Sequence, residues 1–174
     1  MNNSAYSVVS RTSELSSTKT THHQLNIRSA INPNLNRRQQ FGLALLEKSL
    51  FVIGGRDGLK TLNTVDCYSL DRDTWISYPS LTSHRYALQA TILGDQDEEP
   101  ILLSVGGHDG WSFLSSVERY DFGAKAWTSV SPMLNARSNF GLALLGNLCF
   151  VLGGRDSASS LNLCEYYNPL TNKW

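Results

Sequence analysis

Residues 50–58, Leu50-Phe51-Val52-Ile53-Gly54-Gly55-Arg56-Asp57-Gly58, decide the fold, because this apolar run closed by a glycine pair returns at residues 102–110 and 149–157. A Leu, an acidic residue, a Tyr and a Trp follow each glycine pair at the same distances. They are Leu62, Asp66, Tyr68 and Trp75, then Leu114, Glu118, Tyr120 and Trp127, then Leu161, Glu165, Tyr167 and Trp174. Registers kept through every copy indicate an internal repeat.

A repeat of this length with a Gly-Gly pair, a Tyr and a Trp resembles the kelch repeat, one four-stranded blade of a β-propeller. Residues 52–65 and 105–111 are similar to the animal kelch-like family. Members of that family join a BTB domain and a BACK domain to a kelch propeller, act as substrate adaptors for cullin-based ubiquitin ligases, and in several cases bind actin. The resemblance implies an all-β, partial kelch β-propeller of about three four-stranded antiparallel blades, here without the BTB and BACK domains.

The repeat divides the chain into a leader and a partial propeller. Residues 1–30 are rich in Ser and Thr and lack any hydrophobic period, so we expect them to be disordered. Residues 31–174 are the expected propeller, and residues 31–37 match the end of a blade, which predicts the tail of a missing one. The predicted blades are residues 38–84, 85–136 and 137–174. We expect the chain to be cut from a larger propeller at both ends.

Each blade is expected to be a four-stranded meander. Its first strand follows a blade-start arginine, and its second is the apolar run before the glycine pair. Its third ends at the repeat tyrosine, and its fourth begins at the repeat tryptophan. In the second blade, residues 94–100 lengthen the loop between the first two strands. We expect a solvated acidic turn there rather than a calcium site, because the ligand spacing of an EF-hand loop is absent.

The bulk composition excludes several classes of protein. Lys plus Arg and Asp plus Glu balance at 15 each, so no net charge favours nucleic acid or an anionic membrane. Neither a membrane-spanning apolar run nor a signal-peptide pattern is present. Cys67, Cys149 and Cys164 fall on expected strands and predict reduced, buried thiols. We therefore expect a cytoplasmic protein, with association with the cytoskeleton as one option.

Most repeated residues are expected to have structural roles. The glycine pairs lack the following Lys-Ser/Thr or helix of a phosphate-binding loop, so they indicate close backbone approach. The repeat tyrosines and tryptophans are expected to pack between blades. One acid and one arginine occur per blade, which favours structural ion pairs over a binding role for those arginines. These sets are Gly54, Gly55, Gly106, Gly107, Gly153 and Gly154; Asp66, Glu118 and Glu165; and Arg38, Arg85 and Arg137.

Catalytic motifs are missing from the sequence. It has no Gly-x-Ser-x-Gly and no His-Glu-x-x-His motif, and two of its four histidines, His22 and His23, lie adjacent in the leader, which does not suit a metal site. We expect no catalytic residue, metal or cofactor. A propeller enzyme of the oxidase or lyase type stays open as the alternative, as does a truncated remnant without independent activity.

Strand direction predicts where a binding surface lies. Because strands one and two run antiparallel, the loop after each glycine pair and the loop entering each first strand share one rim. The residues expected there are Arg56, His108 and Arg155 after the glycine pairs, Gln39, Tyr86 and Ser138 after the blade-start arginines, and Trp111. The kelch-like resemblance implies that these loop positions contact a protein partner. The alternative is that they are ordinary exposed polar side chains.

The family resemblance implies a protein-interaction module, with a ubiquitin-ligase substrate or actin as the ligand. Contact with a cullin is expected only indirectly, through a form that contains a BTB domain. Self-association is a further expectation, because a propeller that lacks blades exposes an apolar face. Two guanidinium groups on either side of His108 predict that the partner offers an acidic segment.

Overall fold

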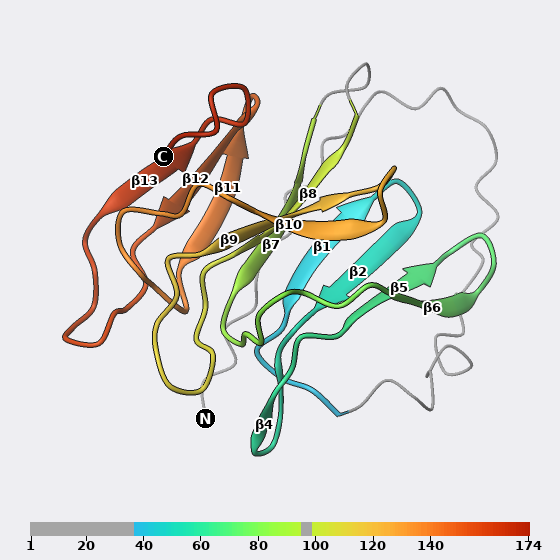
Figure 1. The fold of residues 1–174 in the computed structure, drawn as a ribbon, viewed down its shortest axis with the longest axis horizontal. Helices are drawn as coiled ribbons and strands as arrows, with labels where there is room; N and C mark the ends of the chain where they lie inside the picture. Colours follow the sequence, from blue (N-terminus) through green and yellow to red (C-terminus); the bar gives the residue numbers. More distant parts are fainter. Residues whose placement is uncertain (1–36, 95–98) are drawn as a thin grey trace, which may run out of the picture.

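The computed structural model describes residues 37–94 and 99–174, and every regular element in these ranges is a β-strand (Figure 1). The leader at residues 1–30, residues 31–36 of the expected blade tail and residues 95–98 of the expected acidic turn lie outside the described residues. The described part of the chain contains no helix with the length and apolarity needed to cross a membrane. The all-β prediction is confirmed.

The first two blades are antiparallel sheets of four strands, each in the order of the chain. The first contains β1 (Gly42–Leu46), β2 (Ser49–Ile53), β5 (Val65–Ser69) and β6 (Thr74–Tyr78). The second contains β7 (Gln89–Leu93), β8 (Ile101–Val105), β9 (Val117–Asp121) and β10 (Ala126–Val130). Both are the meanders that the sequence predicts.

The third blade has three strands in the described residues, β11 (Gly141–Leu145), β12 (Leu148–Leu152) and β13 (Cys164–Tyr167). Beyond β13, a single bridge joins Asn168 to Lys173 and brings the chain to Trp174. One small hairpin forms a separate two-stranded sheet, β3 (Arg56–Asp57) paired with β4 (Lys60–Thr61). It extends the first blade at the end that carries its glycine pair.

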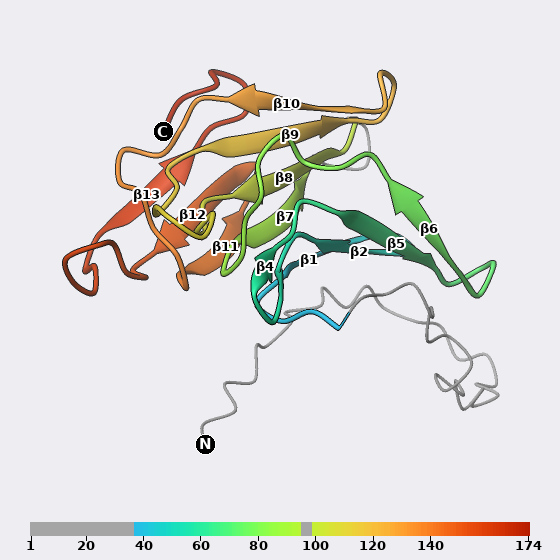
Figure 2. The same ribbon diagram turned by 60° about the horizontal axis from the view of Figure 1, so that its bottom comes forward.

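The blades follow one another with their first strands together. β1 packs against β7, and β7 packs against β11. Each sheet then leads outward to its last strand, so Trp75 of β6 and Trp127 of β10 are on outermost strands. Figures 1 and 2 show the three sheets side by side, from blue and green through yellow to red. The glycine pairs end the second strands and therefore lie nearer the inner strands than the tryptophans do.

Two apolar cores fill the spaces between neighbouring blades. Phe51 and Ile53 of β2 point toward the second blade and pack with Leu102 of β8, all three at most 1% exposed. Val105 and Val117 of the second blade pack with Cys149 and Val151 of the third. Side chains alternate between the two faces of a strand, so both faces of the middle blade are covered and its apolar runs are nearly continuous.

All three cysteines are free thiols, and one of them is exposed although all three were expected to be buried. Cys67 and Cys149 are buried, and burial raises the pKa of the Cys149 thiol to about 12. Cys164 is exposed. It occupies the repeat position of Val65 and Val117, which face the next blade along the chain. In the described structure no blade covers that face of the third sheet, so this thiol faces outward.

Candidate interaction rim

Ion pairs between the blade-start arginines and the repeat acids fix the inner end of every blade. Nη2 of Arg38 lies 2.6 Å from Asp66, and Nη2 of Arg85 lies 2.6 Å from Glu118. Arg137 makes the same contact with Glu165. The arginine side chains are at most 3% exposed, so they are unavailable to a partner and the predicted structural role is confirmed.

The pair in the second blade shows what these arginines hold. Arg85 also donates to the carbonyl oxygens of Gly106 and Ser116, both at 3.0 Å. Glu118 accepts the main-chain N–H groups of Thr82 and Ser83, which belong to the segment that leaves the first blade. Burial tends to raise the pKa of Glu118, but the Arg85 charge and the hydrogen bonds from Thr82 and Ser83 outweigh this effect, so the pKa is lowered. A charged Glu118 therefore ties one blade to the next.

The glycine pairs turn each second strand into the rim loop where backbones meet. Gly54 has a φ of +60°, and a Cβ there would lie 2.5 Å from the carbonyl oxygen of Arg85. Gly107 has a φ of +101°, and its Cβ would lie 2.6 Å from the carbonyl oxygen of Tyr86. Both the left-handed backbone and the close approach require glycine. Close packing of main chains therefore accounts for glycine at these positions.

The residues predicted to share a rim are direct partners in the structure. In each blade, two main-chain hydrogen bonds of 2.9 to 3.0 Å join the residue after the glycine pair to the residue after the blade-start arginine. The three pairs are Gln39 with Arg56, Tyr86 with His108, and Ser138 with Arg155. A third segment continues each bridge through Thr61, Phe113 and Ser160. We call this surface, residues 39, 56–61, 86, 108–113 and 155–160, the interaction rim.

Side chains of the interaction rim contact one another across all three blades. The guanidinium carbon of Arg56 lies 5.1 Å from the centre of the Tyr86 ring, and the Tyr86 and His108 rings are 5.2 Å apart. His108 then meets Phe113 at 4.8 Å, and the Arg155 guanidinium carbon lies 5.8 Å from the Phe113 ring. Contacts of this kind attract cations to aromatic faces. The result is a continuous row with a cation at each end.

The members of the rim differ in accessibility. Gln39 and Arg155 are exposed, and Arg56, Tyr86 and His108 are partly buried. Trp111 is 93% exposed at the tip of the second loop, and its counterpart Leu59 in the first loop is 100% exposed. Ser138 was expected on the accessible surface, but its side chain is buried, with only 2% exposed. Its main chain forms the bridge to Arg155, and its hydroxyl oxygen accepts from Nδ2 of Asn139 at 3.4 Å.

Phe113 is the rim residue that sequence reasoning missed. It stands immediately before the repeat leucine Leu114, as Thr61 stands before Leu62. This position has a different residue in every copy, so no repeated residue type marks it. Its distance in sequence from the glycine pair could have identified it, because that distance places Phe113 opposite His108 in the loop.

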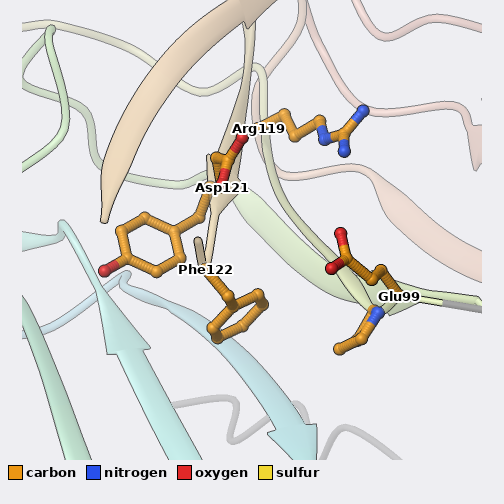
Figure 3. A pocket seen from close by; sticks show the side chains of 6 residues that line it. Glu99, Arg119, Asp121 and Phe122 are labelled. Carbon is orange, nitrogen blue, oxygen red and sulfur yellow. The ribbon is translucent and has the colours of Figure 1, made fainter. Parts of the chain in front are cut away.

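The opposite rim carries a small pocket that mixes charges with aromatic rings. A cavity of about 90 Å³ is lined by Glu99, Pro100, Arg119, Tyr120, Asp121 and Phe122. Figure 3 shows Glu99 across this cavity from Asp121 and Phe122. Within residues 37–94 and 99–174, no group of three or more His, Cys, Asp or Glu side chains is placed to hold a metal ion. Most of the loop considered for calcium lies outside the described residues.

A wider hollow between the first two blades has three aromatic rings in its lining. It has a volume of about 270 Å³ and is lined by Ile76, Ser77, Tyr78, Pro79, Tyr120, Phe122 and Lys125. The rings of Tyr78 and Tyr120 lie 5.6 Å apart, and burial raises the pKa of both phenols. These two rings pack against each other between the blades. They are not poised to exchange protons near neutral pH.

Comparison with known proteins places a Kelch motif on residues 37–82, 101–134 and 136–174. A Kelch repeat and BTB domain-containing protein of Caenorhabditis elegans is 29% identical over 142 residues, which are 82% of this chain and 24% of the relative. Kelch-like protein 36 of Bos taurus is 30% identical over 146 residues, 79% of this chain and 23% of the relative. Kelch-like protein 26 of Danio rerio is 28% identical over 150 residues, which are 83% of this chain and 24% of the relative. The chain spans about a quarter of the length of these relatives.

Proposed function

This chain belongs to the kelch-repeat family, and from that premise we propose that its interaction rim binds an acidic segment of a protein partner. Kelch repeats and kelch-like relatives support a protein-interaction module. The observation that carries the proposal is the row from Arg56 through His108 to Arg155. It places two guanidinium groups on one face of a protein whose formal net charge is zero.

Both cations have hydrogen-bonding capacity for a carboxylate. Arg56 donates through Nε and Nη2 to the carbonyl oxygen of Gly58, at 3.2 and 2.8 Å, which holds the guanidinium in place. A guanidinium has five N–H donors, so others remain for a ligand. Arg155 is exposed beside Phe113. Each charge-assisted contact would contribute about 1.5 to 3 kcal/mol if the partner shields it, and about 0.2 to 1 kcal/mol if it stays exposed.

The exposed tips of the rim indicate the second part of the contact. Trp111 projects from a turn in which Asp109 accepts the N–H groups of both Trp111 and Ser112 at 2.7 Å. A large ring held on an ordered turn loses little conformational freedom on binding, which is typical of interface anchors. We propose that Trp111 enters an apolar depression of the partner while the arginines meet its carboxylates.

Two classes of partner follow for this rim, a ubiquitin-ligase substrate and actin. The name of one relative includes a BTB domain beside the kelch repeat. We propose that this chain contributes the ligand-binding half of such an arrangement, and that contact with a cullin requires a BTB-containing form. We also propose that it acts in the cytoplasm. The free thiols of Cys67 and Cys149 support that proposal.

Binding to two defined probes tests the proposal. Cosedimentation with purified actin filaments examines the actin option, and fluorescence anisotropy with a labelled Glu-rich peptide examines acidic recognition. We expect Arg56→Ala and Arg155→Ala each to weaken peptide binding without changing the fold, and added salt to weaken it as well. Lys48→Ala is the matched control, because Lys48 is an exposed cation on the opposite rim. Equal losses in all three variants, or no binding by the intact chain, would refute recognition by this rim.

A further inference from the structure

His108 accepts a hydrogen bond that holds the tip of its own loop. Its Nδ1 atom lies 2.9 Å from the main-chain N–H of Gly110. A neutral imidazole has one donor nitrogen and one acceptor nitrogen, so an accepting Nδ1 places the proton on Nε2. The ring is confined between Tyr86 and Phe113, at 5.2 and 4.8 Å, which keeps Nδ1 directed at Gly110.

The same position in the first blade makes the opposite kind of contact. Arg56, which corresponds to His108, donates to the carbonyl oxygen of Gly58. A permanent cation can make that contact at any ordinary pH. His108 instead receives an N–H, and an imidazolium carries hydrogen on both nitrogens. A protonated His108 would therefore face the Gly110 N–H donor to donor, and this hydrogen bond would be lost.

Several charged groups surround the imidazole. Asp109 follows it in the chain. Partial burial works to raise the pKa of Asp109, but the N–H groups of Ser112 and Trp111, helped by the charge of His108, outweigh it and lower the pKa. Arg85 lies near Asp109 and interacts with its charge. On the sides of the ring, Arg56 lies over Tyr86 and Arg155 over Phe113. Among the described residues, the charged groups around this loop are therefore one carboxylate, Asp109, and three guanidinium groups, those of Arg56, Arg85 and Arg155.

We propose that protonation of His108 releases the Gly110 N–H and loosens the tip of the turn at residues 109–112, which then depends on the hydrogen bonds of Asp109 to Trp111 and Ser112 alone. Histidine is the side chain that ordinarily changes charge between about pH 5 and 8. The conformational part of this inference stands on the His108 to Gly110 contact alone. Its consequence for partner binding rests on the proposed function of the rim.

Amide hydrogen exchange in the ¹⁵N-labelled full chain tests the inference without any partner. The protection of the Gly110 amide, corrected for the intrinsic pH dependence of exchange, is measured from pH 8 to pH 5 alongside the imidazole signals of His108. We expect Gly110 protection to fall by roughly two- to tenfold, in step with protonation of His108, as one hydrogen bond is lost. Amides of the equivalent third-blade turn, held by Asp156 without a histidine, should stay constant.

Two variants assign the effect to this ring. His108→Asn keeps a side-chain acceptor near the Nδ1 position without titrating, so Gly110 protection should become independent of pH. His84→Asn removes an exposed histidine outside the rim and should leave the pH dependence intact. Constant Gly110 protection while His108 titrates in the unmodified chain would overturn the inference. Because peptide binding by Arg56→Ala is assessed separately at neutral pH, failure of the proposed rim function is distinguishable from failure of the His108 inference.

Discussion

The indole N–H of Trp127 donates to the carbonyl oxygen of Pro79 at 2.8 Å, which ties the outer strand of the second blade to the end of the first. Trp174 repeats the contact with Ser131 at 2.8 Å, one blade further on. Each tryptophan also packs against the repeat tyrosine of its own blade, Tyr120 or Tyr167. The repeat tryptophan is therefore both a packing residue and a hydrogen-bonded link between blades.

Replacing Trp127 with phenylalanine should show how much the hydrogen bond to Pro79 contributes to stability. Trp127→Phe keeps a ring in the buried site but removes the donor to Pro79. We expect the free energy of unfolding to fall by about 0.5 to 1.5 kcal/mol, because one partly buried hydrogen bond between the blades is lost. Urea unfolding followed by circular dichroism measures the change. Trp111→Phe is the control at a 93% exposed site, and a loss there as large as at Trp127 would contradict this explanation.

Removing Glu118 should destabilise the second blade strongly. Glu118→Ala leaves the guanidinium of Arg85, whose side chain is fully buried, without its carboxylate partner. Breaking a buried pair from one side typically costs about 3 to 5 kcal/mol. The exposed pair of Lys48 and Asp71 supplies the comparison, and Asp71→Ala should leave the unfolding midpoint unchanged. Similar midpoints for the two variants would show that the buried pair contributes little.

The stability of the folded chain should decline in acid, because the pKa of Glu118 is lowered by folding. The pKa of Glu118 is lowered in the folded protein, so the unfolded chain binds the extra proton more readily. The stabilisation is therefore present above the ordinary Glu pKa of about 4.3 and is lost as the pH falls through the lower folded value. Urea midpoints from pH 7 to pH 3 measure this loss. In Glu118→Gln the slope below about pH 4.5 should be shallower, and an unchanged slope would assign the acid sensitivity to other carboxylates.

The open face of the third blade should promote self-association. Leu145, Leu152 and Tyr166 lie on one face of the sheet and are 72, 47 and 51% exposed. Apolar area of this kind favours contact with a second copy. We expect sedimentation velocity at micromolar concentration to detect dimers or larger species, and the double variant Leu145→Lys with Leu152→Lys to reduce them. Leu170→Lys, at an 81% exposed turn position, is the control, and a monomeric parent chain would disprove the expectation.

The repeat made most of this architecture predictable from the sequence. The distances from each glycine pair to its Tyr and its Trp, Tyr68 and Trp75 in the first copy, are equal in every copy and assign residues to strands. Antiparallel order then places Arg56 beside Gln39. Features that depend on contacts between blades could not be obtained in this way. Ser138 is covered and Cys164 is open because of which sheet faces neighbour them. Phe113 joins the row of rings through a position that varies among the copies.

The segments that start each blade also determine how the row of blades bends. Gly55 donates its N–H to the carbonyl oxygen of Arg85 at 2.8 Å, and Gly107 does the same to Arg137 at 2.9 Å. The side chains of these arginines reach forward to Gly106 and Gly153 of their own blades. The same set of hydrogen bonds thus determines the angle between neighbouring blades at both junctions. Curvature is therefore encoded junction by junction, so lengthening a loop elsewhere in a blade should leave the angle between blades unchanged.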